Sequence, residues 1–174
     1  MASDLDDHKE RIGYCWGEID ALEAQIDSFI ASGAYKISHE VEPETGDGIF
    51  YIALVKPVPK SFSIRAGSIA HELRATLDAL ACTLAARNGR TAKQVYFPVC
   101  ADESEFLDNK KGAEKIRKIS ELDRNEIARL QPWESGNPLL YGLHIADRIR
   151  KHQRLIVVKN DTGLIGVGFD SHGS

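Results

Sequence analysis

Hydrophobic residues recur along this chain with two different periods, and the period indicates where helices and strands are expected. In the first 32 residues the apolar positions are separated by alternating steps of three and four, which predicts an amphipathic helix ending near Ser32 and Gly33. Such a seam must be covered, and one short helix rarely dimerises alone, so a helix of the same chain is favoured over a second copy. The seam consists of Ile12, Cys15, Ile19, Leu22, Ile26 and Phe29.

The period changes to two after this helix. Tyr35, Ile37 and Val41 alternate with polar residues, which predicts a half-buried strand. The turn-forming sequence PETGDG follows, and then the apolar run IFYIALV at 49–55, which predicts a more deeply buried second strand. The two prolines that come next end this hairpin, because proline cannot donate to a strand ladder.

A long helix is expected from about Ser63 to Arg87, and Asn88 with Gly89 supplies its C-terminal stop. Alanines flank an apolar stripe on this helix and permit the close approach of a partner, so we expect it to be the central core helix. The stripe consists of Ile69, Leu73, Leu77, Leu80 and Leu84. The segment VYFPV that follows, at 95–99, is either a third strand or an extended linker.

Capping signals place two later helices. The sequence at 120–123 is typical of an N-cap, and a short helix follows until Gln131 and Pro132. Asn137 before Pro138 predicts the start of a helix that runs to about residue 153. The runs LIVVK and LIGVGF, on either side of NDTG, then predict a second hairpin. The chain is therefore expected to be one α+β domain over 1–174: a bundle of about four or five helices with two β-hairpins, either separate or joined in one small antiparallel sheet.

Composition narrows the class of protein. The 174 residues are enough for one compact domain, and 43% hydrophobic with 28% charged residues is typical of a soluble globular protein. The net charge of -4 gives no general attraction to nucleic acid. Three cysteines without metal-binding spacing favour a reducing compartment. The N-terminus does not resemble a signal peptide, and no apolar run is long enough to span a membrane. We therefore expect a cytoplasmic location and no membrane partner.

Candidate chemistry is concentrated on two helices. Successive helical residues advance by about 100°, which places one polar group of the 138–153 helix opposite Leu139, Leu143, Ala146 and Ile149. A carboxylate, imidazoles and cations on one face suit acid–base chemistry or the binding of an anion. The alternative is a solvated face with internal ion pairs, which cations near a helix C-terminus favour. The group consists of His144, Asp147, Arg148 and Lys151, with His152 at its edge.

The central helix carries a second polar group, His71, Arg74 and Asp78, opposite its leucine stripe. If the two polar faces meet, they form a groove between the helices at 64–87 and 138–153, and a cytoplasmic binding or regulatory module for a small anionic ligand or RNA is the leading interpretation. If they do not meet, both faces are solvated and the chain is a structural subunit with no ligand site.

Several other classes of site are not indicated. The sequence HELR lacks the second histidine of a zinc protease, because residue 75 is Ala75. The phosphate-binding loop GxxxxGK[ST] does not occur, and GVGF near the end lies in a predicted strand. We therefore expect no cofactor and no metal, although His144 and Asp147 have a spacing that permits chelation. The basic segment 111–120 is expected to be a solvated helix face.

The combination of HELRATLDALACTLAARNG, VYFP, LQPW and LHIADRIRKHQRL resembles a group of uncharacterised bacterial proteins over residues 65–158. That resemblance implies no activity. The chain also resembles, more distantly, the HEPN superfamily of helical bundles, which often dimerise and include metal-independent ribonucleases. Their signature is an arginine followed after four to six residues by a histidine. Here Arg148 and His152 are separated by three residues, and Ile149 replaces the usual polar residue.

The HEPN resemblance implies that Arg148 and His152 form the catalytic pair. His152 would act as the general base or acid, and Arg148 would stabilise the charge of the phosphorane. A homodimer is a further expectation, to which the N-terminal seam and the alanine-rich central helix both contribute.

Overall fold

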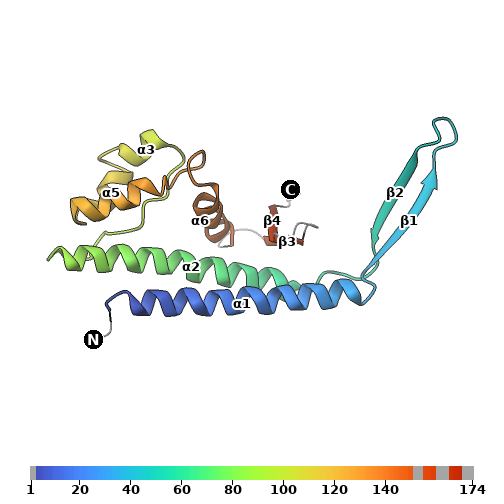
Figure 1. The fold of residues 1–174 in the computed structure, drawn as a ribbon, viewed down its shortest axis with the longest axis horizontal. Coiled ribbons are helices and arrows are strands. Elements are labelled where there is room, and N and C mark those ends of the chain that lie inside the picture. Colours follow the sequence, from blue (N-terminus) through green and yellow to red (C-terminus); the bar gives the residue numbers. More distant parts are fainter. Residues whose placement is uncertain (1–2, 151–154, 160–164, 170–174) are drawn as a thin grey trace.

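The computed structural model describes residues 3–150, 155–159 and 165–169. Two long antiparallel helices, α1 (Asp6–Ala31) and α2 (Lys60–Arg87), lie side by side and form the base of the molecule (Figure 1). The seam of α1 faces α2, where Cys15, Leu22 and Ile26 are buried together with Phe62 and Ile69. The expected cover by another helix of the same chain is therefore confirmed. No helix in the described part of the chain is both long and apolar enough to cross a membrane.

Three short helices cover the C-terminal half of α2: α3 (Glu103–Leu107), α4 (Gly112–Ile116) and α5 (Glu121–Arg129) (Figure 1). The sequence predicted α5 with its cap, and Ser120 Oγ accepts a hydrogen bond from Asp123 N. It did not predict α3, because an element of five residues is too short to show a helical period. The expected helix face at 111–120 is present in part as α4, but it is not fully solvated, since Ile116 and Ile119 are buried in the core. A single apolar core lies between these helices, α2 and the linker at 95–100. Its large members are Leu84, Val95, Phe97, Val99, Phe106, Ile116, Ile119, Ile127 and Trp133.

The segment VYFPV is an extended linker and not a strand of a sheet. The isolated β-bridge that the described residues contain joins Cys100, the residue after this segment, to Trp133. Val95, Phe97 and Val99 are buried in the core, whereas Tyr96 is exposed. Pro98 is buried as well, so the burial does not alternate as it would in a strand and arises from packing of the linker against helices.

The last helix, α6 (Pro138–Arg150), starts where the capping signal predicted and packs against α2 (Figure 1). Asn137 Oδ1 accepts a hydrogen bond from Leu140 N at 3.1 Å, and Pro138 occupies the first helical position. The chain then forms β3 (Leu155–Lys159) and β4 (Ile165–Phe169), an antiparallel hairpin of which β3 lies against α2 and α6.

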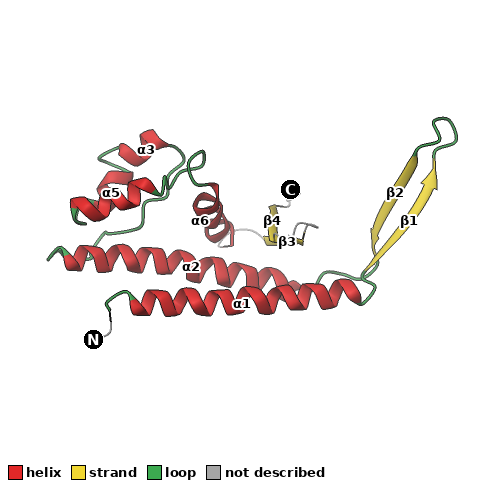
Figure 2. Ribbon diagram, viewed as in Figure 1, coloured by secondary structure: helices red, strands yellow, loops and turns green. Residues whose placement is uncertain are grey.

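The first hairpin, β1 (Tyr35–Val41) and β2 (Gly48–Leu54), projects from one end of the α1–α2 pair (Figure 2). Every residue of both strands is exposed, so two expectations are wrong: that the strand at Tyr35–Val41 would be half-buried, and that the strand at 49–55 would be deeply buried. An apolar run shows that burial is favourable, but it does not show that the same chain supplies the cover. The two hairpins form separate two-stranded sheets, and the structure is an α+β fold with six helices in its described part.

Candidate functional site

The polar faces of α2 and α6 meet at His71 and Asp147. His71 Nδ1 on α2 lies 2.8 Å from Asp147 Oδ1 on α6, within hydrogen-bond distance. The Asp147 side chain is only 9% exposed, whereas that of His71 is 48% exposed. A carboxylate removed from water needs hydrogen bonds or a nearby cation, so this imidazole compensates part of the desolvation of Asp147. Asp147 is thus not on a solvated face.

Arg74 and Asp78, one turn apart on α2, hold the backbone of the linker. Arg74 Nη2 donates to the carbonyl oxygen of Phe97 at 2.8 Å, and the N–H of Phe97 donates to Asp78 Oδ1 at 2.9 Å. Arg74 Nη1 also lies 2.9 Å from Asp78 Oδ1, but without hydrogen-bond geometry, so we treat this contact as an attraction between charges. Arg74 is buried and does not lie on a solvated face. These two residues therefore have structural partners within the chain.

His144 lies half-buried among cations from three helices. Burial lowers the pKa of His144 below its ordinary value of 6.5, the charges of Arg74, Lys115 and Arg148 lower this pKa further, and Asp147 opposes the change. The neutral imidazole is thus favoured in the folded protein. The same electrostatic potential that disfavours a proton on His144 would favour a bound anion.

The remaining predicted site residues lie at the end of α6. Arg148 is exposed, and it forms no ion pair with another described residue. Lys151 and His152 are outside the described residues, so the predicted catalytic pair of Arg148 and His152 stays a prediction. In the described ranges no group of three or more histidine, cysteine, aspartate or glutamate residues is arranged to hold a metal ion.

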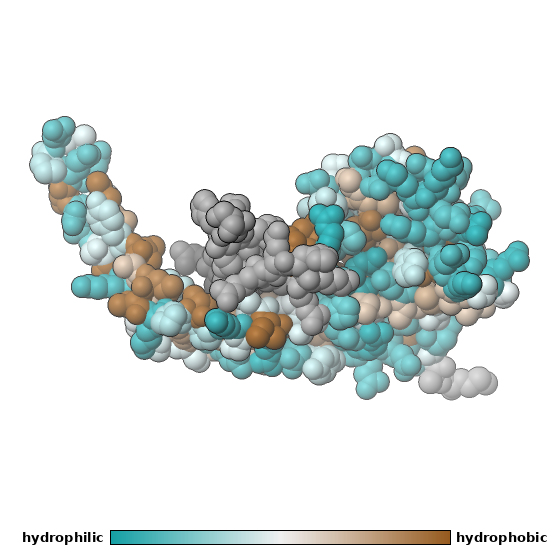
Figure 3. Space-filling view, turned by 180° about the vertical axis from the view of Figure 1, so that it is seen from behind, coloured by the Kyte–Doolittle hydropathy of each residue, from teal (hydrophilic) through white to brown (hydrophobic). Residues whose placement is uncertain are grey.

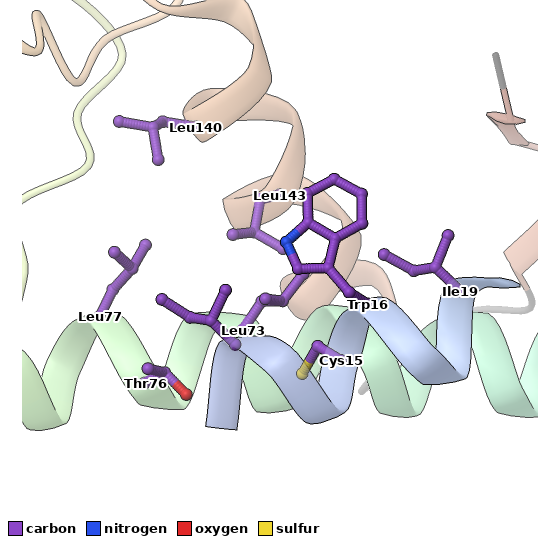
Figure 4. A pocket seen from close by; sticks show the side chains of 9 residues that line it. Cys15, Trp16, Ile19, Leu73, Thr76, Leu77, Leu140 and Leu143 are labelled. Carbon is purple, nitrogen blue, oxygen red and sulfur yellow. The ribbon is translucent and has the colours of Figure 1, made fainter. Parts of the chain in front are cut away.

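An apolar cavity of about 260 Å³ lies where α6 crosses the α1–α2 pair, and the sequence did not predict it (Figure 4). Trp16 and Ile19 on α1, Leu73 and Leu77 on α2, and Leu143 on α6 are among its lining residues. The hydroxyl of Thr76 in the lining already donates to the carbonyl oxygen of Glu72. The cavity thus suits an apolar group.

The helical wheel placed only part of the buried side of α6 correctly: Leu143 and Ala146 face the body of the protein as expected, but Leu139 does not. Leu139 was expected on the buried side, but it is 84% exposed. The side that faces α1 and α2 carries Leu140 and Leu143 in the cavity wall and Asp147 one turn later, beside His71. A wheel gives the angles between residues, but it does not say which side meets the core when both sides are mixed. Leu140, Leu143 and Asp147 are separated by steps of three and four, and this spacing in the sequence indicates that they lie on one face of the helix.

These features define an α+β protein in which α6 carries a buried carboxylate, paired with a half-exposed imidazole of α2, one helical turn after a residue that lines an apolar cavity. Comparison with family models, with curated proteins and with solved structures finds no match. The resemblances to the bacterial group and to the HEPN superfamily therefore stay predictions from the sequence.

Proposed function

We propose that this protein is a binding module for a small amphipathic anion, and that the site lies where α6 crosses α2. The observation that carries the proposal is the 2.8 Å contact between His71 and Asp147, which joins α2 and α6 one helical turn after Leu143 of the cavity wall. Ligand sites in proteins are commonly concave and apolar, with a few polar groups that fix orientation. The arrangement at this crossing has both parts.

The cavity supports an apolar body for the ligand. Its volume of about 260 Å³ lies below the ~300–1,000 Å³ of most small-molecule sites, which favours a short acyl chain or a single ring. Trp16 is an exposed aromatic residue in the lining. Burial of an apolar group against Trp16, Leu73 and Leu143 would supply the main binding energy through the hydrophobic effect.

The cations around His144 support a negatively charged head for the ligand. Leu143 in the cavity wall directly precedes His144 in α6, so both lie in the same turn of the helix. Lys115 and Arg148 approach His144 from α4 and α6 and lower its pKa together with Arg74. An anion bound there would be stabilised by these charges and would raise the pKa of His144 again.

The test is isothermal titration calorimetry of the full chain with octanoate, with octanol as the uncharged ligand of equal length. We expect saturable binding of octanoate, at least about tenfold tighter than octanol if the cations act on the head group. Leu143→Phe should weaken binding by filling the cavity. Leu139→Phe, the same exchange at an exposed position of α6, should leave it unchanged. No saturable heat with octanoate, or equal effects of the two variants, would overturn the proposal.

A further inference from the structure

The hairpin β1–β2 presents one continuous apolar face. In its antiparallel register, directly opposed residues share a face. The pairs Tyr35–Leu54 and Ile37–Ile52, with Phe50, therefore lie together on one face, and the opposite face carries Lys36, Ser38, Glu40, Ile49, Tyr51 and Ala53. The apolar face consists of Tyr35, Ile37, His39, Val41, Gly48, Phe50, Ile52 and Leu54.

Side-chain contacts within the hairpin support this assignment. The ring centroids of His39 and Phe50 are 4.8 Å apart. A Cβ atom placed on Gly48 would lie 2.7 Å from Nε2 of His39, so the imidazole lies directly over that glycine. The face is therefore an ordered surface of paired side chains.

The described residues leave this face uncovered. Ile37, Phe50 and Ile52 are 67%, 69% and 70% exposed. Figure 3 shows apolar side chains over the hairpin and where it joins the helices. An isolated two-stranded hairpin is marginally stable in water at best, and an exposed apolar face of this kind marks an interaction surface.

We propose that a second copy of this chain covers the apolar face, with two hairpins packed face to face and antiparallel about a two-fold axis. The area fits a dimer. Since large aromatic side chains alone carry ~150–250 Å² each, six mostly exposed large residues present on the order of 600 Å² per copy. Two such faces together bury about 1,200 Å², the lower end of the range for stable interfaces.

The charge distribution favours a second copy in this orientation. The tip of the hairpin is acidic, with Glu42, Glu44 and Asp47, whereas its base is basic, with Lys56 and Lys60. None of these five side chains forms an ion pair among the described residues. In an antiparallel pair the acidic tip of each copy lies over the basic base of the other, and the two-fold axis makes this attraction twice. The acidic tip disfavours an anionic lipid surface as the occupant.

The experiment measures the mass of the full chain by sedimentation equilibrium, with two matched variants of neighbouring residues on β2. We expect a dimer for the wild type. Ile52→Lys, on the apolar face, should raise the dimer dissociation constant by about 30-fold or more, as loss of a central interface residue does. Tyr51→Lys, with the same added charge on the opposite face, should leave the dimer intact.

A charge exchange tests the orientation. Glu42→Lys and Lys56→Glu should each weaken the dimer, and the double variant should recover it, because both contacts are restored by the two-fold axis. Circular dichroism checks that the helices stay folded in every variant. A monomeric wild type overturns the proposal, also when that monomer binds to vesicles. Dissociation by both β2 variants, or by neither, overturns the assignment of the face.

Discussion

The contact of Arg74 with the linker makes the sharpest prediction for stability. Replacement of Arg74 by methionine keeps most of the apolar stem and removes the donor to Phe97 O and the charge beside Asp78. A hydrogen bond from a charged donor contributes about 1.5–3 kcal/mol. The charge contact contributes less, because the Asp78 side chain is 32% exposed and we discount it to about 0.5–1 kcal/mol. We expect Arg74→Met to lower the free energy of unfolding by about 3 kcal/mol.

Urea unfolding followed by circular dichroism measures this change. Arg148→Met is the matched control, because it makes the same exchange at an exposed position of α6 and should change stability by less than about 0.5 kcal/mol. In a double-mutant cycle, Arg74→Met should cost less in an Asp78→Asn background, since the charge contact is then already lost. Equal destabilisation by Arg74→Met and Arg148→Met would refute the reasoning, because burial and the contact with Phe97 would then contribute nothing.

Three further predictions concern pH, RNA and thiols. Because the folded pKa of His144 lies below 6.5, the unfolded chain binds more protons as the pH falls below that value, and stability is lost from there down to the folded pKa. His144→Gln should lose less stability than the wild type between about pH 7 and 5.5, and equal losses contradict this. If Arg148 and His152 form a ribonuclease pair, the protein cleaves mixed RNA in EDTA and His152→Ala does not; an inactive wild type across several RNA types excludes this activity. Burial raises the pKa of the Cys15, Cys82 and Cys100 thiols, so thiol reagents should label the native protein much more slowly than the denatured one, and equal rates would contradict this.

The sequence predicted those elements whose signals are local. The period of α1, the cap at Ser120 and the Asn137–Pro138 start of α6 each depend on neighbouring residues, and each is present in the structure. The start of α2 is less exact: the helix begins at Lys60, directly after Pro59, and not near Ser63. Helix ends are less sharply specified by sequence than helix interiors, because few residues determine them.

The candidate site was only partly predictable, because it depends on the crossing of distant helices. The sequence selected His71 and Asp147 as chemically capable residues, but their 2.8 Å contact joins positions 76 residues apart. Trp16 gave no signal, because an aromatic residue on the outer side of α1 acquires a role only when α6 passes over it. In the same way, the alternation in β1 predicted an apolar face correctly, but it did not show that this face stays uncovered within the chain.

The root of the first hairpin has a consequence for how the chain can be altered. The N–H of Val55 donates to the carbonyl oxygen of Ala34 at 2.7 Å, so the chain leaves the helical body and returns to it at nearly the same point. Residues 35–54 thus form an insertion whose two ends are already joined by a backbone hydrogen bond. The entropy of closing a loop changes slowly with its length. The stability of the helical body therefore depends little on the length of this insertion. The part of the hairpin beyond Tyr35, whose ring contacts Phe29 of α1, can therefore be replaced without altering the packing of α1 on α2.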